Sequence, residues 1–246
     1  MDALIIAAGF GSRLRDVSDS KPLTPIAGVP LLELGARQAK AAGVERVVVV
    51  TGHEAERIEA ALPAISERVG VPVVSHRVAD WSKPNGWSVI AGADTIDGNY
   101  LLMMSDHIFS ARILTALAQQ HGPDRGVTLA VDYRCDNPLV DPDDATWVKL
   151  DQRGFITAIG KTIPAYDAVD CGAFLATPEL AEAIRAAIAE GKAGSLSEGM
   201  QRLADAGRAA TMDIGTAWWL DVDDPRAYEL AEDQAPRELP EIYATL

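Results

Sequence analysis

The residues with the clearest chemical potential lie near the start of the chain, where glycines and two cations follow an apolar run. Leu4–Ala8 is apolar, Gly9 and Gly11 come next, and Arg13 and Lys21 follow. Glycine permits backbone angles and close approach that a side chain would block, so successive N–H groups can converge on an anion. Arginine adds a planar fork of donors, and lysine adds a compact charge. The stretch therefore indicates a phosphate-binding loop.

Two familiar phosphate loops do not fit this stretch. The dinucleotide fingerprint needs a third glycine where Leu14 stands, and the P-loop needs a Gly-Lys-Ser/Thr sequence that the chain lacks. An ordinary strand-to-helix turn at Gly9 and Gly11 is the alternative. The two cations that follow the glycines count against it.

A second candidate, Asp106, comes just after the apolar run Tyr100–Met104. Open parallel sheets bind ligands at the carboxyl ends of their strands, so Asp106 is expected beside the glycine loop. Mg²⁺ takes one or two carboxylates together with substrate phosphates and water, which makes Asp106 a metal-ligand candidate. The alternative is an aspartate that caps a helix beginning near Ser110. His107, at the same strand end, is more typical of a structural residue than of a catalytic one.

Composition limits the class of protein. The chain has 246 residues, 48% of them apolar and 24% charged, which suits one folded α/β domain spanning 1–246. A net charge of -14 argues against nucleic acid or an anionic membrane as the main partner, so phosphate binding must be local. Cys135 and Cys171 form neither a metal spacing nor a disulfide framework. Since no apolar run reaches membrane length, we expect a soluble, cytoplasmic protein without membrane insertion.

The elements that must position these side chains form βαβ units. A strand, helix, strand order implies right-handed crossovers and a parallel sheet. Between the later strands, Trp81–Val89 contains turn signals, and Ser88 is a candidate cap for the helix that follows. Strands are predicted at 4–8, 47–50, 71–74 and 100–104, and helices at 30–43 and 54–62.

From Gly126 the pattern changes to strands joined by loops, which predicts an antiparallel extension over residues 126–176, laid over the parallel sheet. The acidic loop 136–144 has too few apolar residues to pack and is predicted to be a mobile lid or rim. Further predictions are helices at 178–190 and 196–206, a strand at 209–214, a helix that begins at Pro225, and a peripheral tail at 234–246.

The order of these motifs resembles the nucleotidyltransferases that condense a nucleoside triphosphate with a phosphorylated alcohol. The resemblance implies a Rossmann-like, GT-A-like α/β fold, in which helices flank a mostly parallel central sheet with a small antiparallel extension. It also implies that the loop, Arg13 and Lys21 hold the triphosphate. Ser20 departs from the proline that many relatives have before the lysine. The opening motif, Ala-Ala/Gly-Gly-x-Gly-Ser/Thr-Arg-Leu and then Lys-Pro, is matched by Ala7, Ala8, Gly9, Gly11, Ser12, Arg13, Leu14, Lys21 and Pro22.

The resemblance assigns nucleotide-base contacts to a glycine-containing loop and the helix after it, which Asn85, Gly86 and Ser88 match. A surface turn capped by serine is the alternative there. In the related enzymes a lysine after the hairpin of the extension contacts substrate phosphate, and Lys161 matches it on the acceptor side. A solvated hairpin lysine is the alternative.

A second metal ligand is also implied by the resemblance, which places it in a Trp-x-Asp-x-Asp-Thr-Pro segment. Asp221 matches the first aspartate of that segment. Asp223 is the rival ligand, because strand alternation points it to the same side as Asp221. Asp224 stands where the family has threonine, and both residue types cap helices.

Within this superfamily the chain is most similar to inositol-1-phosphate cytidylyltransferases, on Asn85–Val89, Ser105–Ile108 and Val169–Gly172. No membrane segment follows, so a stand-alone form is expected. The resemblance implies Mg²⁺-dependent transfer of CMP from CTP to inositol 1-phosphate, which gives the CDP-alcohol and pyrophosphate. A homodimer is one expected assembly.

Two alternatives remain open at this point. The acceptor could instead be phosphocholine, an aminoalkylphosphonate or a sugar 1-phosphate, because the motifs that hold the triphosphate are shared. A non-catalytic nucleotide-binding regulator is the other alternative, and the presence of both Asp106 and Asp221 counts against it. Aromatic residues that could surround a quaternary ammonium are Tyr133, Trp147, Tyr166 and Trp219.

Overall fold

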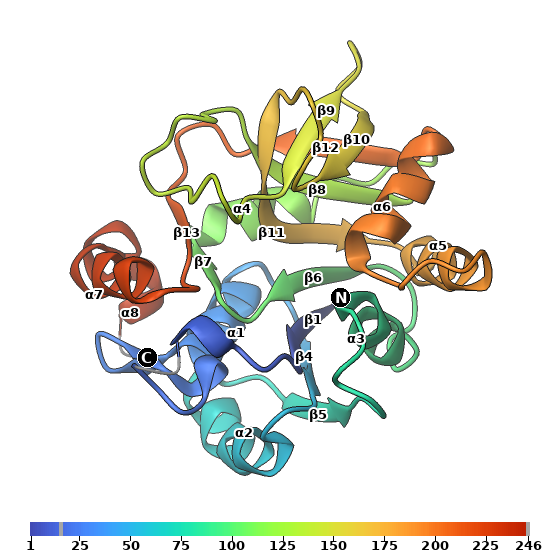
Figure 1. Ribbon diagram of the computed structural model, residues 1–246. Coiled ribbons are helices and arrows are strands. Elements are labelled where there is room, and N and C mark those ends of the chain that lie inside the picture. Colours follow the sequence, from blue (N-terminus) through green and yellow to red (C-terminus); the bar gives the residue numbers. More distant parts are fainter. Residues whose placement is uncertain (15–16, 245–246) are drawn as a thin grey trace.

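The computed structural model describes residues 1–14 and 17–244 (Figure 1). Its strands are β1 (Asp2–Ala7), β2 (Pro25–Ile26), β3 (Val29–Pro30), β4 (Arg46–Thr51), β5 (Val73–Arg77), β6 (Tyr100–Met104), β7 (His107–Phe109), β8 (Val127–Asp132), β9 (Trp147–Leu150), β10 (Ile156–Gly160), β11 (Ala168–Ala176), β12 (Ala209–Asp213) and β13 (Trp219–Asp221). Its α-helices are α1 (Leu31–Ala41), α2 (Ala55–Val69), α3 (Asn85–Ala93), α4 (Ala111–Leu117), α5 (Pro178–Ala189), α6 (Leu196–Asp205), α7 (Pro225–Glu238) and α8 (Pro240–Tyr243).

One nine-stranded sheet runs through the molecule, with the path β10-β9-β11-β6-β1-β4-β5 and with β8 and β12 branching from β11. The strands β6, β1, β4 and β5 are parallel, as predicted. Their register places Ile6 beside Met104, so β1 and β6 end at the same edge of the sheet. The loops that follow these two strands therefore start side by side.

Alternation along the strands divides the core between the two faces of the sheet. In β1, Ala3, Ile5 and Ala7 pack on one face with residues of α1, α2 and α4. Leu4 and Ile6 pack on the other face with residues of α3, α5 and α6. Because helices cover both faces, β1, β4 and β6 are apolar along most of their length, which confirms the prediction of a buried parallel sheet flanked by helices; the edge strand β5 ends in the polar residues Ser75, His76 and Arg77.

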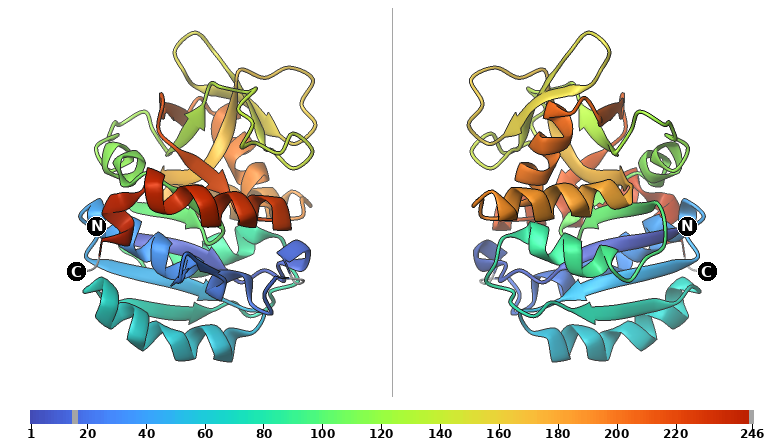
Figure 2. Two further views of the ribbon diagram at one scale, coloured as in Figure 1. Left: turned by 90° about the vertical axis from the view of Figure 1, so that its left-hand side faces the viewer. Right: turned by 90° about the vertical axis from the view of Figure 1, so that its right-hand side faces the viewer.

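The extension differs from the prediction in how it joins the sheet. It does not lie over a face: β11 pairs antiparallel with β6, so the extension continues the edge of the parallel half. The same strand pairs with β8 and β9, while β12 lies parallel to β8. Figure 2 shows α7 lying across the molecule at the level where the parallel half and the extension meet.

Helix α2 is longer than predicted. It passes through Pro63 and ends at Val69, not at Leu62. Its buried residues Ile58, Leu62, Ile65 and Val69 form one apolar stripe, and burial of that stripe outweighs the hydrogen bond that Pro63 cannot donate. The strand predicted at 71–74 is likewise displaced and forms β5.

The C-terminal segment is packed and not peripheral as predicted. Leu239 is fully buried and Ile242 is 2% exposed, in a third core cluster with Leu31 and Leu34 of α1. The Arg37 guanidinium donates to the carbonyl oxygen of Ile242 at 2.8 Å. A short run of apolar residues within a Pro- and Glu-rich stretch was the only signal for this packing. Among the described residues, no helix has both the length and the apolar character needed to span a bilayer.

Glu33 of α1 anchors this arrangement, because its carboxylate is 1% exposed and pairs with Arg37 and Arg68, each at 2.7 Å. Burial alone would raise the pKa of Glu33, but hydrogen bonds from Arg68 and Arg37 outweigh burial and hold the pKa below its usual value. A depressed carboxyl pKa stabilises the fold above the unfolded-state pKa. That contribution is lost as the pH falls through the folded-state pKa.

We expect Glu33→Gln to lower the free energy of unfolding by about 2 kcal/mol at pH 7, because two arginines lose a buried partner. The difference from the wild-type chain should shrink as the pH is lowered to about 3, since the wild-type carboxyl then becomes protonated too. Urea unfolding at both pH values measures this difference in the free energy of unfolding, with Glu67→Gln, at an exposed position of α2, as the control. An equal difference at both pH values would contradict the assignment.

Candidate active site

The glycine loop leaves the carboxyl end of β1 and returns toward it through Lys21. Gly11 has a φ of +61°, and a Cβ there would lie 2.8 Å from Cβ of Lys21. Both the backbone conformation and the close approach therefore require glycine at this position. By contrast, a Cβ on Gly9 would have no atom within 4 Å. Gly11 is the glycine that allows Lys21 to lie against the loop.

A short ladder that the sequence did not reveal joins the two predicted metal ligands. Strand β7 pairs antiparallel with β13, and Asp221 lies opposite His107. The N–H of Val222 donates to the carbonyl oxygen of Asp106 at 2.9 Å, which continues the pairing by one residue. Two aspartates that are distant in sequence thus face one space. Because Asp106 precedes a strand, the alternative in which it caps a helix is wrong.

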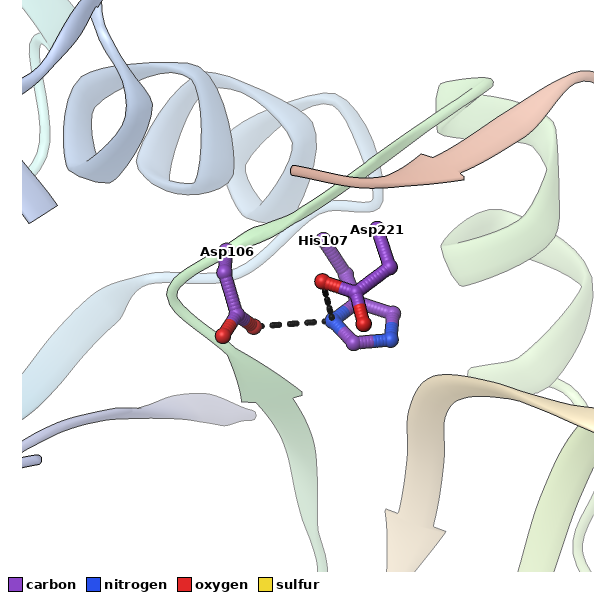
Figure 3. Close-up of side chains that lie close together, drawn as sticks. All are labelled: Asp106, His107 and Asp221. Atoms are coloured by element: carbon purple, nitrogen blue, oxygen red, sulfur yellow. Dashed lines mark hydrogen bonds and ion pairs between the residues drawn. The ribbon is translucent and has the colours of Figure 1, made fainter. Parts of the chain in front are cut away.

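His107 lies between these carboxylates (Figure 3). Its Nδ1 lies 2.8 Å from Asp106 Oδ1 and 3.7 Å from Asp221 Oδ1. The ring stacks on Trp219 with the ring centroids 6.2 Å apart, and it also meets Gly172, where a Cβ would lie 2.7 Å from Cγ of the imidazole. These contacts fix the ring beside the two carboxylates. His107 therefore belongs to the site, although its place in the sequence favours a structural role.

The charges on these groups follow from their mutual contacts. Burial alone would lower the pKa of His107, but Asp221 and Asp106 outweigh burial and raise it to about 9. Burial alone would raise the pKa of Asp106, but Lys21 and His107 hold it well below its usual range. Burial raises the pKa of Asp221, helped by the nearby Asp106. At neutral pH the site therefore contains an imidazolium beside an ionised Asp106.

A row of ion pairs of alternating sign crosses the mouth of the site. Lys21 Nζ contacts Asp106 at 2.6 Å and also contacts Asp223. Arg13 contacts the same Asp223 and reaches Asp144 at 2.6 Å. Asp144 then contacts Lys161. The full order is Lys161, Asp144, Arg13, Asp223, Lys21 and Asp106, and we call it the ion-pair row. The predicted cations and Asp106 do converge, together with Asp221 across from them.

Asp106 and Asp221 have the chemistry that a magnesium site requires. The candidate ligand atoms of Asp106, His107 and Asp221 lie within 4.8 Å of one another. Oδ1 of Asp221 is buried and accepts no hydrogen bond from the residues described, so it is free to bind a cation. Asp223, the rival, belongs to a second such group with Asp144 and Asp221, and two cations engage it, as they do Asp106. Asp221 is common to both groups. Because carboxylate oxygens fit Mg²⁺ better than an imidazole does, Asp106 and Asp223 are the candidates for the second ligand.

Two cavities meet at this row. The first, which we call the loop cavity, is lined by the glycine loop and by Lys21, Ser88 and Trp81. The second, which we call the extension cavity, is lined by the extension, α6, β13 and α7. The residues common to both are Arg13, Asn85, Met104, Asp106 and Asp223. A reaction between two ligands, one in each cavity, would therefore take place beside Asp106.

The residues expected to bind the nucleotide, through its phosphates or its base, divide into two groups. Ala7, Ala8, Gly9, Gly11, Ser12, Asn85 and Ser88 line the loop cavity. Gly86 lines neither cavity; a Cβ there would overlap the carbonyl oxygen of Gly194, so its role is close packing.

Helix α3 begins at Asn85, not at Ser88, and Ser88 is buried in its second turn. The predicted serine cap is therefore wrong. The cause is Pro84, whose fixed φ suits the residue before a helix, so that the helix starts one turn earlier. Asn85 accepts a hydrogen bond from the N–H of Leu196 at 2.9 Å, which ties α3 to α6.

Sequence interpretation missed several polar residues of the extension cavity, among them Asp144, Asp170 and Arg226. Asp144 had been included only in the acidic rim, because its partner Arg13 is 131 residues away. Asp170 accepts from the N–H of Gly172 at 2.7 Å, yet burial raises its pKa to about 6. The available signal was an aspartate two residues before a glycine within an otherwise apolar run. Arg226 donates to the carbonyl oxygen of Pro138 at 3.0 Å and holds the rim segment to α7.

Comparison with known proteins identifies the class to which this fold and site belong. The family model of the MobA-like NTP transferase domain matches residues 3–207, so the chain belongs to this family. It is a nucleotidyltransferase, as the glycine loop indicated.

Comparison with individual proteins shows which nucleotidyltransferases the chain resembles. The chain is 34% identical over 233 residues to the "Bifunctional IPC transferase and DIPP synthase" of Rubrobacter xylanophilus, covering 94% of this chain and 51% of the relative. The protein of the same name from Aquifex aeolicus is 29% identical over 94% of this chain and 50% of its own length. The chain thus spans about half the length of these curated relatives. The structure of the inositol-1-phosphate CTP transferase from T. maritima shares the fold, with a TM-score of 0.83, 24% identity and 97% coverage of both chains.

The geometry of the glycine loop gives a local test. Gly11→Ala should lower the free energy of unfolding by about 1–2 kcal/mol, because alanine must adopt a left-handed conformation against Lys21. Gly9→Ala, in the same loop, should change it by less than about 0.5 kcal/mol, since its Cβ would meet open space. Urea unfolding of both variants at pH 7 measures the difference. Equal losses of stability would show that Gly11 is not the constrained position.

Proposed function

We propose that this nucleotidyltransferase moves CMP from CTP to inositol 1-phosphate. The supporting observation is the junction of the two cavities, where cations and carboxylates from six distant positions meet. The proposal also rests on the likeness to proteins named IPC transferase and inositol-1-phosphate CTP transferase. In this proposal the whole chain serves as one nucleotidyltransferase domain, with residues 126–176 on the acceptor side.

The loop cavity suits the triphosphate. Its wall contains the glycine loop, and its cations are Arg13, Lys21 and Lys83. Lys21 is 9% exposed, so its charge acts where water screens it little. Arg13 is 48% exposed and lines both cavities, so its fork can hold the triphosphate and the departing pyrophosphate from the loop cavity. Asn85 and Ser88 lie farther along the same wall and are proposed to contact the base.

The extension cavity suits the phosphorylated alcohol. Lys161 lines it and would hold the incoming phosphate at the end nearest Asp144. In the transfer, an oxygen of that phosphate attacks the α-phosphorus of CTP. The bond to the β-phosphate oxygen breaks, and pyrophosphate leaves with the electron pair. The protein supplies no covalent nucleophile; it aligns two anions and offsets their repulsion.

Asp106 and Asp221 are proposed to hold the Mg²⁺ ion. When bound, the ion supplies Lewis-acid stabilisation of the charge on the α-phosphate. The residues themselves prepare the site: His107 orients Asp106 by a hydrogen bond, and Lys21 restrains its other oxygen. A carboxylate held in this way loses little freedom when a cation binds.

The extension cavity favours a polyol over choline. A quaternary ammonium needs several aromatic faces around it. Of the four aromatic candidates, Trp219 lines the cavity and is stacked on His107, whereas Tyr133, Trp147 and Tyr166 are not part of the described lining. Trp147 instead stacks on Tyr166 at 4.1 Å. The polar groups at the wall, including Asp170 and Thr146, can bind hydroxyl groups.

The decisive experiment is pyrophosphate release across a grid of nucleoside triphosphates and phosphorylated alcohols. We expect the highest kcat/KM for CTP with inositol 1-phosphate. Turnover should disappear when EDTA removes Mg²⁺ and should return when Mg²⁺ is restored. Phosphocholine and sugar 1-phosphates serve as the competing acceptors. Preferred turnover of one of them would replace the proposed acceptor, and CTP binding without pyrophosphate release would support a regulator.

Substitution of the two rival aspartates separates their roles. Asp221→Asn should reduce kcat by at least about 10²-fold and raise the Mg²⁺ concentration needed for half-maximal rate, because it removes a proposed metal ligand. Asp223→Asn should chiefly alter the KM for CTP, since it frees Lys21 and Arg13. Initial rates over a Mg²⁺ titration distinguish the two. A larger shift in the Mg²⁺ requirement for Asp223→Asn would exchange the assignments.

A further inference from the structure

Asp144 is a single carboxylate that joins two cations proposed to serve different substrates. Its Oδ2 accepts from Arg13 Nη2 at 2.6 Å, and its Oδ1 accepts from Lys161 Nζ. Arg13 lines both cavities, whereas Lys161 lines the extension cavity alone. The contact therefore runs from the proposed triphosphate side to the proposed acceptor side.

The backbone that carries Asp144 is held in place while its side chain stays accessible. The N–H groups of Asp144 and Ala145 both donate to the carbonyl oxygen of Asp141, at 3.2 Å and 2.9 Å. Arg226 fastens the preceding part of the rim to α7 through Pro138. The Asp144 side chain is 23% exposed, and its partners Arg13 and Lys161 are 48% and 56% exposed. Rotation of one side chain is thus enough to break both ion pairs.

A bound triphosphate changes the balance at this point. Phosphate oxygens match the arginine fork as well as a carboxylate does and bring more charge, so a triphosphate in the loop cavity would displace Asp144 from Arg13. The same negative charge repels the released carboxylate. When Asp144 turns away, Lys161 loses its partner and becomes available to another anion.

Building on the proposed function, we infer that Asp144 is a positioning residue that couples the two substrates. Without a triphosphate it occupies Lys161, so the acceptor phosphate binds weakly. With a triphosphate on Arg13, Lys161 is released and binds the acceptor phosphate. Asp144 thereby gives favourable coupling between two polyanions that would otherwise repel each other. By linkage, the acceptor must tighten triphosphate binding by the same factor.

The test is calorimetric titration of inositol 1-phosphate into the full chain with Mg²⁺. It is done with and without a saturating CTP analogue that has a methylene bridge between its α- and β-phosphates. For the wild-type chain we expect the analogue to lower the acceptor Kd by about 10-fold. In Asp144→Asn the factor should fall to about 2-fold or less, because the acceptor binds the analogue-free chain more tightly.

Two further variants define the contact. Asp144→Glu keeps the charge and should retain most of the coupling. Asp143→Asn removes a neighbouring carboxylate of the same exposed turn, which lines neither cavity, and should behave as the wild type. The inference is overturned if Asp144→Asn keeps the full coupling factor or if the wild-type chain shows none. Equal loss of acceptor affinity with and without the analogue would make Asp144 a direct acceptor ligand and would also overturn it.

A separate measurement keeps this inference distinct from the proposed acceptor. The analogue alone should bind Asp144→Asn about 3-fold more tightly than the wild-type chain, because Arg13 then has to leave one carboxylate, Asp223, and not two. Unchanged affinity for the analogue overturns the role of Asp144. Failure of inositol 1-phosphate to bind the wild-type chain, with tighter analogue binding by Asp144→Asn, would instead reject the acceptor and retain Asp144 as a competitor for Arg13.

Discussion

The ion-pair row is the interaction on which the site depends. If an acidic chain is to bind two polyanions, as proposed for this one, it must hold its few cations in place before the ligands arrive. It does so with aspartates: Asp144 lies between Lys161 and Arg13, Asp223 lies between Arg13 and Lys21, and Asp106 pairs with Lys21 at the end of the row. The pairs of the exposed Lys161 and Arg13 contribute little to folding stability, about 0–1 kcal/mol each. Their consequence is positional, because each carboxylate occupies a place that a phosphate can take over.

The sheet brings the members of this row together from distant parts of the chain. Parallel pairing of β1 with β6 sets the glycine loop beside Asp106, and the pairing of β7 with β13 brings in Asp221 and the residues after it. The antiparallel junction of β11 with β6 then places the extension beside the same edge. Gly172, within β11, leaves room for the His107 ring. The irregular strand pairing around Gly172 thus also shapes the candidate site.

The acidic residues of this nucleotidyltransferase are therefore part of its candidate active site and are not confined to the rest of the surface. The extension cavity has more aspartates than cations along its wall. Such a wall repels anions unless positive charge becomes available to them. A bound metal ion can supply that charge, or a carboxylate can move away and uncover the cation that it paired with. The arrangement explains how a chain of net charge -14 can serve phosphorylated substrates without a broad basic surface.

The sequence by itself determined the parallel sheet, the glycine loop and the place of Asp106 after an apolar run, because apolar runs, glycines and adjacent polar residues are local signals. Asp221 came from the resemblance to a family segment and not from such a signal. The sequence did not determine the end of α2, the packing of Leu239 and Ile242, or the start of α3, where burial or a proline outweighed the local pattern. Only the tertiary structure decided that His107 and Asp144 belong to the site. Their partners lie on other strands or across 131 residues of chain, and ion pairs at such separations leave no spacing that a sequence can display.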